Sequence, residues 1–257
     1  MIDRSSWARL RVAGGDRVRF LQGLTTVNVE TLADGAHAWG AILSPKGRVL
    51  TVIDTARIGE AFVIACEAAL GDKTRALLER YAVMDDVTFE PIAGPAHQIW
   101  DSVDDVWLAP IAEGAAPGAI AETDAAAEAL RIRGGFLRYG VDVDEDHFPF
   151  ETPLAQFLDY KKGCYVGQEP VFRVHAQGNA ARALRGLVVD GDGALATGTP
   201  IKHPSKDNAG VVTSSIVDGG RRLALGYLHR TCWEPGGEVE IAGRRAIVCE
   251  LPILEPA

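Results

Sequence analysis

A cysteine framed by two glycines is the feature that most constrains this sequence. Cys164 lies between Gly163 and Gly167, with two lysines before it and Gln168 and Glu169 after it. Glycine allows positive φ and close approach of the backbone, whereas buried strands and helices seldom hold so many polar residues and glycines together. The stretch is therefore predicted to form a turn that presents the thiol.

The four cysteines of the chain are predicted to differ in role. The thiolate is the reactive form, and Lys161 and Lys162 would favour it at Cys164 if they face the sulfur. The alternative is a small buried residue, since free cysteine is among the most buried types. The polar residues around Cys164 favour a functional thiol over a buried packing residue. The other three lie in apolar, strand-like runs and are expected to be free thiols of the core: Cys66, Cys232 and Cys249.

Several common site types lack support in the sequence. No pair of ligands has the spacing of a structural zinc site, although Cys164 could meet His175, His203 or His229 in space. There is no GxxxxGK[ST] loop and no GxSxG elbow, and the Gly-Asp-Gly run at 191–193 misses the dinucleotide fingerprint. An intrinsic metal site, nucleotide hydrolysis, serine hydrolysis and NAD binding are therefore disfavoured.

Charge and hydropathy restrict the partners of the chain. The formal net charge is -9, so no general electrostatic footprint for nucleic acid exists and stable nucleic-acid binding is not expected. No run approaches the roughly 18 apolar residues of a membrane span, and no signal peptide is recognisable, so membrane association is not expected. We expect a cytoplasmic protein, or one of the mitochondrial matrix if this is a mature eukaryotic chain.

The first two thirds of the chain alternate between strand and helix patterns. In the first part we expect helices after Asp16 and Asp72, and strands at 7–12, 38–43, 48–53, 61–66 and 87–92. A second α+β unit follows, with strands at 98–100 and 106–108, a Gly/Ala/Pro-rich loop at 113–118 and a helix at 124–131.

From residue 182 onward the helical period disappears. Short strands separated by glycine turns are expected at 184–189, 210–215, 223–228, 238–241 and 246–251. Such a series is typical of a small β-barrel or sandwich.

Two polar clusters could line a pocket beside the thiol. One is the Ser-Pro-Lys-Gly-Arg turn at 44–48, which could also be only a solvated hairpin, and the other is 149–153, where Glu151 could simply cap a helix. Planar guanidinium groups could pair a ligand carboxylate, although solvation of each remains open. The arginines concerned are Arg131, Arg133, Arg173, Arg182 and Arg185.

The stretch 162–169 resembles the K-G-C-Y-x-G-Q-E motif of the YgfZ-like branch of the superfamily that contains the glycine-cleavage T-protein, a folate-binding group. Further similarity lies at 20–28, in the glycine hairpin at 44–49, at Arg131-Ile132 ahead of Glu151, and in the last region at 210–214 and 224–227. The resemblance covers nearly the whole chain.

The resemblance implies an α+β fold of the T-protein type. Two ferredoxin-like or mixed α/β units and a C-terminal antiparallel β-barrel would form a three-domain cloverleaf around a central folate channel. The expected domains are 1–94, completed by parts of 140–181, then 95–181, which ends in the thiol loop, and finally 182–257.

The function implied by the resemblance is folate-dependent assembly or repair of [4Fe–4S] clusters in target enzymes, with a link to tRNA modification. Cys164 would be the functional thiol and a transient cluster ligand, supported by Lys162, Gln168 and Glu169. One thiol cannot hold a cluster alone, so an iron–sulfur carrier or target protein is an expected partner, and no permanently bound metal is expected. The residues expected to bind tetrahydrofolate or a derivative are Gly47, Arg48, Arg131, Glu151, Tyr165, Gly167 and Arg173.

Two positions depart from the T-protein pattern. Thr51 stands where the T-protein has its catalytic aspartate, and Asp54, three residues on, would lie on the opposite face of a strand. Arg133 stands where the T-protein has a pterin-binding glutamate. A non-enzymatic assembly factor is therefore favoured, and the alternative is a tetrahydrofolate-dependent aminomethyl or one-carbon transferase.

Overall fold

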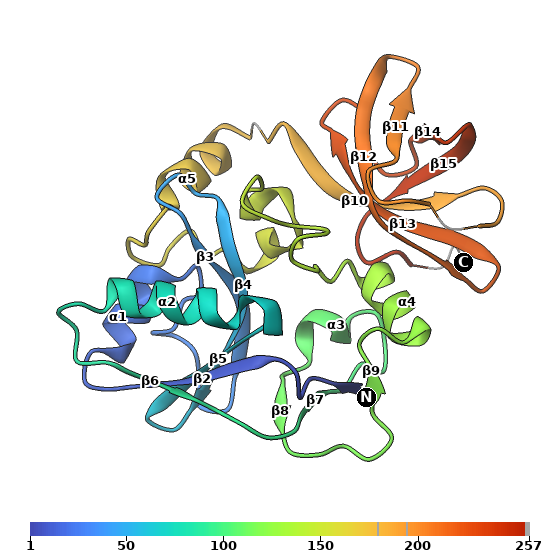
Figure 1. The fold of residues 1–257 in the computed structure, drawn as a ribbon. Coiled ribbons are helices and arrows are strands. Elements are labelled where there is room, and N and C mark those ends of the chain that lie inside the picture. The colour runs from blue at the N-terminus through green and yellow to red at the C-terminus, as the bar shows by residue number, and fades with distance from the viewer. Residues whose placement is uncertain (179, 194, 255–257) are drawn as a thin grey trace.

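Three sheets organise the computed structural model, which describes residues 1–178, 180–193 and 195–254 (Figure 1). The first sheet has the order β3-β4-β5-β2-β6, the second the order β8-β7-β1-β9, and the last six strands close into a barrel. The predicted fold class, mixed α/β structure with a C-terminal antiparallel barrel, is confirmed. The last positions of the third predicted domain, 255–257, lie outside the described residues.

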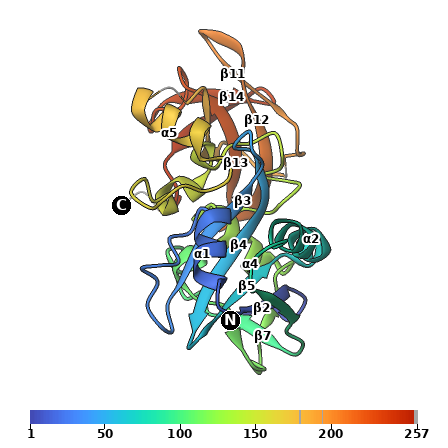
Figure 2. The same ribbon diagram turned by 90° about the vertical axis from the view of Figure 1, so that its left-hand side faces the viewer.

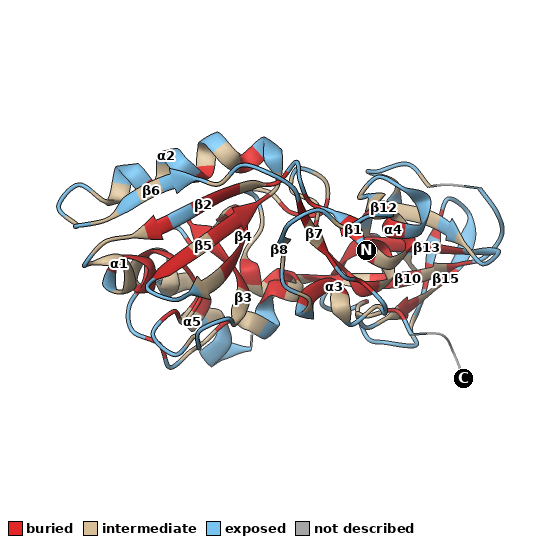
Figure 3. Ribbon diagram, turned by 90° about the horizontal axis from the view of Figure 1, so that it is seen from below, coloured by how far each residue is buried: buried red, intermediate tan, exposed pale blue. Residues whose placement is uncertain are grey.

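The first sheet is antiparallel and follows the predicted strands closely. Its strands are β2 (Ala8–Ala13), β3 (His37–Leu43), β4 (Val49–Ile58), β5 (Ala61–Cys66) and β6 (Thr88–Pro91). Both faces of β3, β4 and β5 are largely buried, as the red in these strands shows in Figure 3, because one face packs on helices and the other on the second unit.

Two helices cover one face of this sheet. These are α1 (Arg17–Leu24) and α2 (Gly71–Tyr81), which follows the short 3-10 turn η1 (Ala68–Leu70). Phe20 and Leu21 of α1 and Leu78 of α2 share an apolar core with the strands. The predicted cap of the second helix is wrong by two positions: α2 is capped by Leu70, and Asp72 lies inside its first turn, where a carboxylate still favours the helix dipole.

The second sheet is built from four very short strands. They are β1 (Ile2–Asp3), β7 (Ala96–Gln98), β8 (Ala112–Glu113) and β9 (Ile120–Ala121), and the unit adds the helices α3 (Asp105–Leu108) and α4 (Ala125–Gly134). The first residues of the chain therefore pair with the second sheet and not with the first. We propose the same three-domain division as the sequence indicated, with residues 2–3 added to the second unit.

The strand predicted at 106–108 is wrong, because this segment is the helix α3. The Asp105 carboxylate accepts hydrogen bonds from the backbone N–H groups of Asp101 and Ser102 and closes the turn before the helix. Val106 and Trp107 are buried next to each other while Leu108 is exposed, a helical pattern that a three-residue apolar run cannot reveal by itself.

The barrel contains every strand predicted for the last region and one more. Its strands are β10 (Arg182–Val189), β11 (Pro200–His203), β12 (Lys206–Asp218), β13 (Arg221–His229), β14 (Glu238–Ile241) and β15 (Arg244–Cys249). β11 was not predicted; it pairs with β12 and β14 and completes the closure.

A connecting region joins the second unit to the barrel. It holds the 3-10 turns η2 (Pro149–Glu151) and η3 (Pro153–Phe157) and the helix α5 (Gln168–Gln177). α5 lies beside β3 at the upper left of Figure 1, across from the barrel at the right, and Figure 2 shows both in the upper part of the molecule. In the described ranges no helix is long and apolar enough to cross a membrane.

Candidate functional site: the thiol loop

Cys164 is exposed on an irregular loop between η3 and the start of α5, as the turn prediction required. Gly163 beside it is also exposed, whereas Lys162 and Tyr165 on either side are buried. The backbone therefore dips into the protein before and after the thiol and leaves the sulfur at the surface.

Lys162 anchors the loop from below. Its ammonium donates hydrogen bonds to the carbonyl oxygens of Thr25 at 2.6 Å and Val27 at 2.5 Å, and it lies 5.0 Å from the centre of the Tyr165 ring. Burial lowers the pKa of Lys162 to about 7. The amine thus points to the segment that follows α1, and it holds the thiol loop against the connection between α1 and β3.

Asp159 supplies a second anchor that the sequence analysis did not identify. One carboxylate oxygen accepts from the backbone N–H groups of Lys161 at 2.7 Å and Lys162 at 3.1 Å, and the other accepts from the Asn28 amide at 2.6 Å. The hydrogen bond from Asn28 is the main reason that the pKa of Asp159 is lowered. The loop is consequently fixed to the segment at 25–28 by the Lys162 ammonium and by the Asp159 carboxylate.

Gly167 and Gly47 let two loops touch through their backbones. Gly167 has φ 79°, and a Cβ there would lie 2.3 Å from the carbonyl oxygen of Ser44 in the β3–β4 hairpin. Gly47 has φ 77°, and a Cβ there would meet the carbonyl oxygen of Gly167 at 3.1 Å. Both glycines therefore serve the close approach of hairpin and thiol loop.

The last residues of the motif begin α5, a helix that the sequence analysis did not predict. The Gln168 side chain accepts a hydrogen bond from the backbone N–H of Tyr165 at 3.3 Å. Glu169 and Arg173 form an exposed ion pair of 2.6 Å on the outer side of the helix. Gln168 thus shapes the turn beside the thiol, while Glu169 and Arg173 face solvent.

Arg131 lies away from the loop, at the junction of α4 and the barrel. Its five N–H groups all have partners: the two Glu128 oxygens, the Phe136 carbonyl, Asp142 at 2.6 Å and the Ser214 hydroxyl. Burial by itself would lower the pKa of Arg131, but the Asp142 and Glu128 carboxylates outweigh this effect and raise the pKa. Binding of a ligand by this guanidinium would require breaking an internal bond.

Arg48 belongs to the hairpin that touches the thiol loop. It donates to the carbonyl of Asp146 at 2.6 Å and stacks over the Phe148 ring at 3.8 Å. Its guanidinium therefore joins the hairpin to the connecting region.

Glu151 is buried at the start of the connecting region and does cap its own 3-10 turn. One of its oxygens accepts from the Phe148 N–H at 3.0 Å, and both face Arg182 at 3.2 Å. It also lines a cavity of about 350 Å³ together with Phe150, Arg185 and Trp233. Glu151 therefore belongs to a different place from Cys164, which lines none of the cavities described here.

Arg185 is the cation of this cavity. It donates to the Trp233 carbonyl at 3.1 Å and lies 5.1 Å from the centre of that indole ring. Burial lowers its pKa, while the Glu250 and Glu234 carboxylates act in the opposite direction, and Glu250 lines the same cavity. In the described part of the chain neither carboxylate is close enough to Arg185 for an ion pair, so this half-buried guanidinium is available to an anionic ligand group.

Thr51 and Asp54 point to opposite faces of β4, as expected. Thr51 contacts the Thr74 hydroxyl of α2 at 3.1 Å, whereas the Asp54 carboxylate is bound to His37 at 2.7 Å on the other face. Both side chains are buried. Within the described ranges, no group of three or more His, Cys, Asp or Glu residues is arranged to hold a metal ion.

No protein-family profile matches this chain. An aminomethyltransferase of Herpetosiphon aurantiacus is 24% identical over 98% of this chain and 86% of its own length. The tRNA-modifying protein YgfZ of Cronobacter sakazakii is 26% identical, over 87% and 83% respectively. This chain is thus similar over most of its length to a YgfZ protein and to an aminomethyltransferase.

A further relative and a solved structure complete the comparison. For an aminomethyltransferase of Halothermothrix orenii, 29% identical, the match spans 68% of this chain and only about half, 48%, of the relative. The glycine cleavage system aminomethyltransferase T from Bartonella henselae superposes with a TM-score of 0.82 over 99% of this chain and 86% of its own, at 18% identity. The fold is therefore of the T-protein type.

Proposed function

We propose that this chain is a folate-binding accessory protein for the assembly or repair of [4Fe–4S] clusters, with Cys164 as its working thiol. The observation that carries the proposal is an exposed cysteine on a loop that is fixed on every side. The loop is held in place by contacts of Lys162, Asp159 and Gly167. A cysteine with only a packing role would not require these contacts.

The chemistry is a ligand exchange on a cluster that is cargo. Cys164 gives its proton to solvent, and its sulfur ligates one iron as a carrier thiolate leaves that iron and takes up a proton. In the transfer to the target, a target thiol loses its proton and its sulfur replaces Cys164 on the iron, Cys164 takes up a proton, and no electron is transferred. A single thiol cannot hold a cluster alone, and hence a carrier or target protein must supply the other ligands.

Folate would be held in the cavity that contains Glu151, and the residues there fit it. The carboxylate of Glu151 can accept from a pterin ring, Phe150 and Trp233 offer aromatic faces, and Arg185 can pair the glutamate end. When bound, tetrahydrofolate supplies one-carbon chemistry. Among the other predicted folate contacts, Arg48 is bound to the connecting region, and Arg131 and Arg173 have internal partners.

Folate binding can be tested by quenching of tryptophan fluorescence on titration with 5-formyltetrahydrofolate. Arg185→Gln should weaken binding, whereas Lys202→Gln, the same loss of charge on an exposed barrel residue outside this cavity, should leave it unchanged. Equal folate affinity of the two variants would show that this cavity does not bind folate.

Cluster transfer itself can be tested with purified components. A cluster-loaded carrier and an apo target enzyme are mixed with this protein, and recovery of target activity is followed. We expect acceleration by the wild type and by Cys249→Ser, but not by Cys164→Ser. Acceleration by all three proteins would reduce Cys164 to a structural residue.

A second candidate is a tetrahydrofolate-dependent one-carbon transferase, which the aminomethyltransferase names of several relatives favour. Its best acid–base group would be Asp54, buried on the face of β4 opposite Thr51. It predicts turnover of a methylamine donor that Asp54→Asn abolishes. The tRNA link in the YgfZ name is proposed to be indirect, through tRNA-thiolating enzymes that carry clusters.

A further inference from the structure

The cavity proposed for folate has an acidic edge beside its only cation. Of the described residues that line this cavity, only Arg185 is cationic. Glu250 also lines it and is exposed, so its carboxylate lies where the cavity opens to solvent. Glu234 is exposed too, and it accepts a hydrogen bond at 3.0 Å from the indole N–H of Trp233, another lining residue. The edge of the cavity therefore carries two carboxylates.

Neutral groups, and not these carboxylates, hold the Arg185 guanidinium in place. It donates hydrogen bonds to the carbonyl oxygens of Trp233 and Leu184, each at 3.1 Å. The charges of Glu250 and Glu234 nevertheless act on it, because both oppose the lowering of its pKa by burial. A ligand carboxylate can therefore pair with Arg185, but any further negative charge of the ligand lies within reach of two carboxylates.

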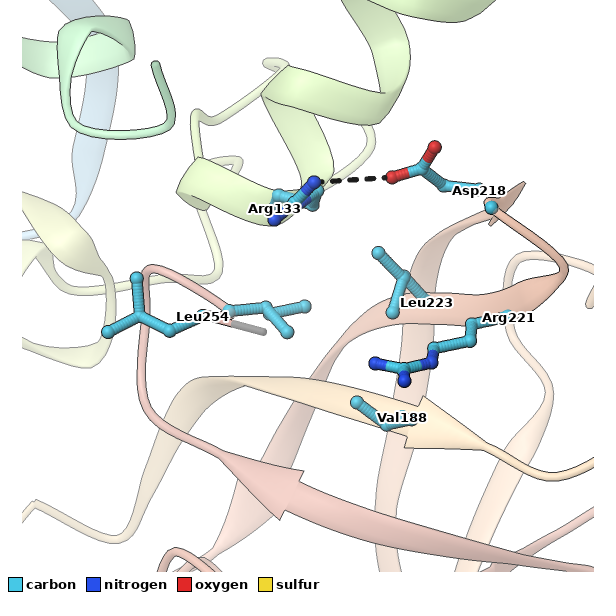
Figure 4. A pocket seen from close by; sticks show the side chains of 8 residues that line it. Arg133, Val188, Asp218, Arg221, Leu223 and Leu254 are labelled. Atoms are coloured by element: carbon cyan, nitrogen blue, oxygen red, sulfur yellow. Dashed lines mark ion pairs between the residues drawn. The ribbon is translucent and has the colours of Figure 1, made fainter. Parts of the chain in front are cut away.

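The cavity shown in Figure 4 treats its carboxylate differently. It lies between α4 and the barrel, and there Asp218 faces Arg133 in an ion pair of 3.6 Å. By contrast, no ion pair of Glu250 occurs among the residues that the structure describes. The charge of Glu250 is therefore not neutralised by a neighbouring cation, and it can repel an anion at the edge of the folate cavity.

We propose that this cavity selects folates with a single glutamate over folates that carry a chain of γ-linked glutamates, and that Glu250 sets the preference. The inference rests on the proposed folate site, in which Arg185 pairs the first glutamate. Each further γ-linked glutamate adds one carboxylate and extends toward the open edge, where Glu250 and Glu234 lie and no second cation lines the cavity. Like charges placed against the longer tail are a means of discrimination.

The test compares 5-formyltetrahydrofolate with one and with five glutamates, by quenching of the tryptophan fluorescence of the full chain at low ionic strength. The form with one glutamate should bind about five-fold more tightly, because exposed like charges repel only weakly. Glu250→Gln should reduce this ratio to about two-fold by improving the affinity for the longer form. Salt at about 0.5 M should also reduce the ratio, since it screens exposed charges.

Controls separate this preference from net charge, from folding and from the folate site itself. Glu240→Gln removes the same charge from an exposed barrel residue outside this cavity and should leave the ratio unchanged. If neither form binds, the proposed folate site and this inference both fail. If Arg185→Gln weakens binding of the short form but the wild type binds the long form as tightly, only this inference is overturned. It is also overturned if Glu250→Gln, melting at the wild-type temperature, leaves the ratio unchanged.

Discussion

The thiol loop and the Arg131 junction use polar residues in opposite ways. At the loop, Lys162 and Asp159 bind backbone groups so that one side chain, Cys164, is left exposed. At the junction, every N–H of Arg131 is satisfied inside the protein, mainly by Glu128 and Asp142. The comparison teaches that a conspicuous polar residue in the sequence can be a support as readily as a site.

The largest effect is expected at the junction. Arg131→Met leaves the fully buried Asp142 without its cation, while Glu128 keeps Arg138 as a partner, and breaking a buried pair typically costs about 3–5 kcal/mol of unfolding free energy. Chemical denaturation measures it. The matched control is Arg173→Met, which removes an exposed pair worth about 0–1 kcal/mol. Equal losses in the two variants would contradict the distinction between the buried and the exposed pair.

The glycines of the thiol loop should give the next largest effect. Gly167→Ala places a methyl group 2.3 Å from the Ser44 carbonyl at a positive φ, and such backbone strain costs about 1–3 kcal/mol. Gly163→Ala is the control, since no atom lies within 4 Å of the new Cβ. Thermal unfolding of the pair measures the difference, and a Gly167→Ala protein as stable as Gly163→Ala would show that the loop and hairpin are not in contact.

Lys162 should make stability depend on pH. Its pKa falls from 10.5 in the unfolded chain to about 7 in the folded protein, so between these values the unfolded state binds the extra proton. Unfolding free energy contributed by this residue therefore rises as pH increases from about 7 to 10.5. The difference between wild type and Lys162→Met, which does not titrate, should change in favour of the wild type across this window. A constant difference would mean that the amine is solvated.

The smallest effect on stability is expected for the thiol itself. Cys164→Ser changes an exposed side chain and should alter the unfolding free energy by less than about 0.5 kcal/mol. In the native wild type, iodoacetamide should label Cys164 well before Cys66, whose pKa burial raises to about 11. Peptide mass spectrometry checks the order, and early labelling of Cys66 would mean that the first sheet opens readily.

Local patterns predicted what depends on neighbours in sequence. The thiol turn, the glycine hairpin and the first-sheet strands follow from glycine spacing and alternation, and the structure contains them. The helix α5 was not predicted because it begins at Gln168, inside the motif, and the whole motif was interpreted as a turn.

Long-range contacts could not be predicted in this way. Nothing near Lys162 in the sequence indicates that its amine reaches Thr25, and nothing near Arg131 indicates that Ser214 of the barrel receives its guanidinium. Both partners lie more than 80 residues away. The same limit explains why Arg185 could be proposed as a carboxylate partner without its cavity being foreseen.

The most direct measurement is the activity of a [4Fe–4S] enzyme in cells that lack this gene and carry either wild type, Cys164→Ser or Cys249→Ser. We expect wild type and Cys249→Ser to restore the enzyme activity, and Cys164→Ser, equally abundant and equally stable, not to restore it. Restoration by Cys164→Ser to the level of the wild type would contradict the account.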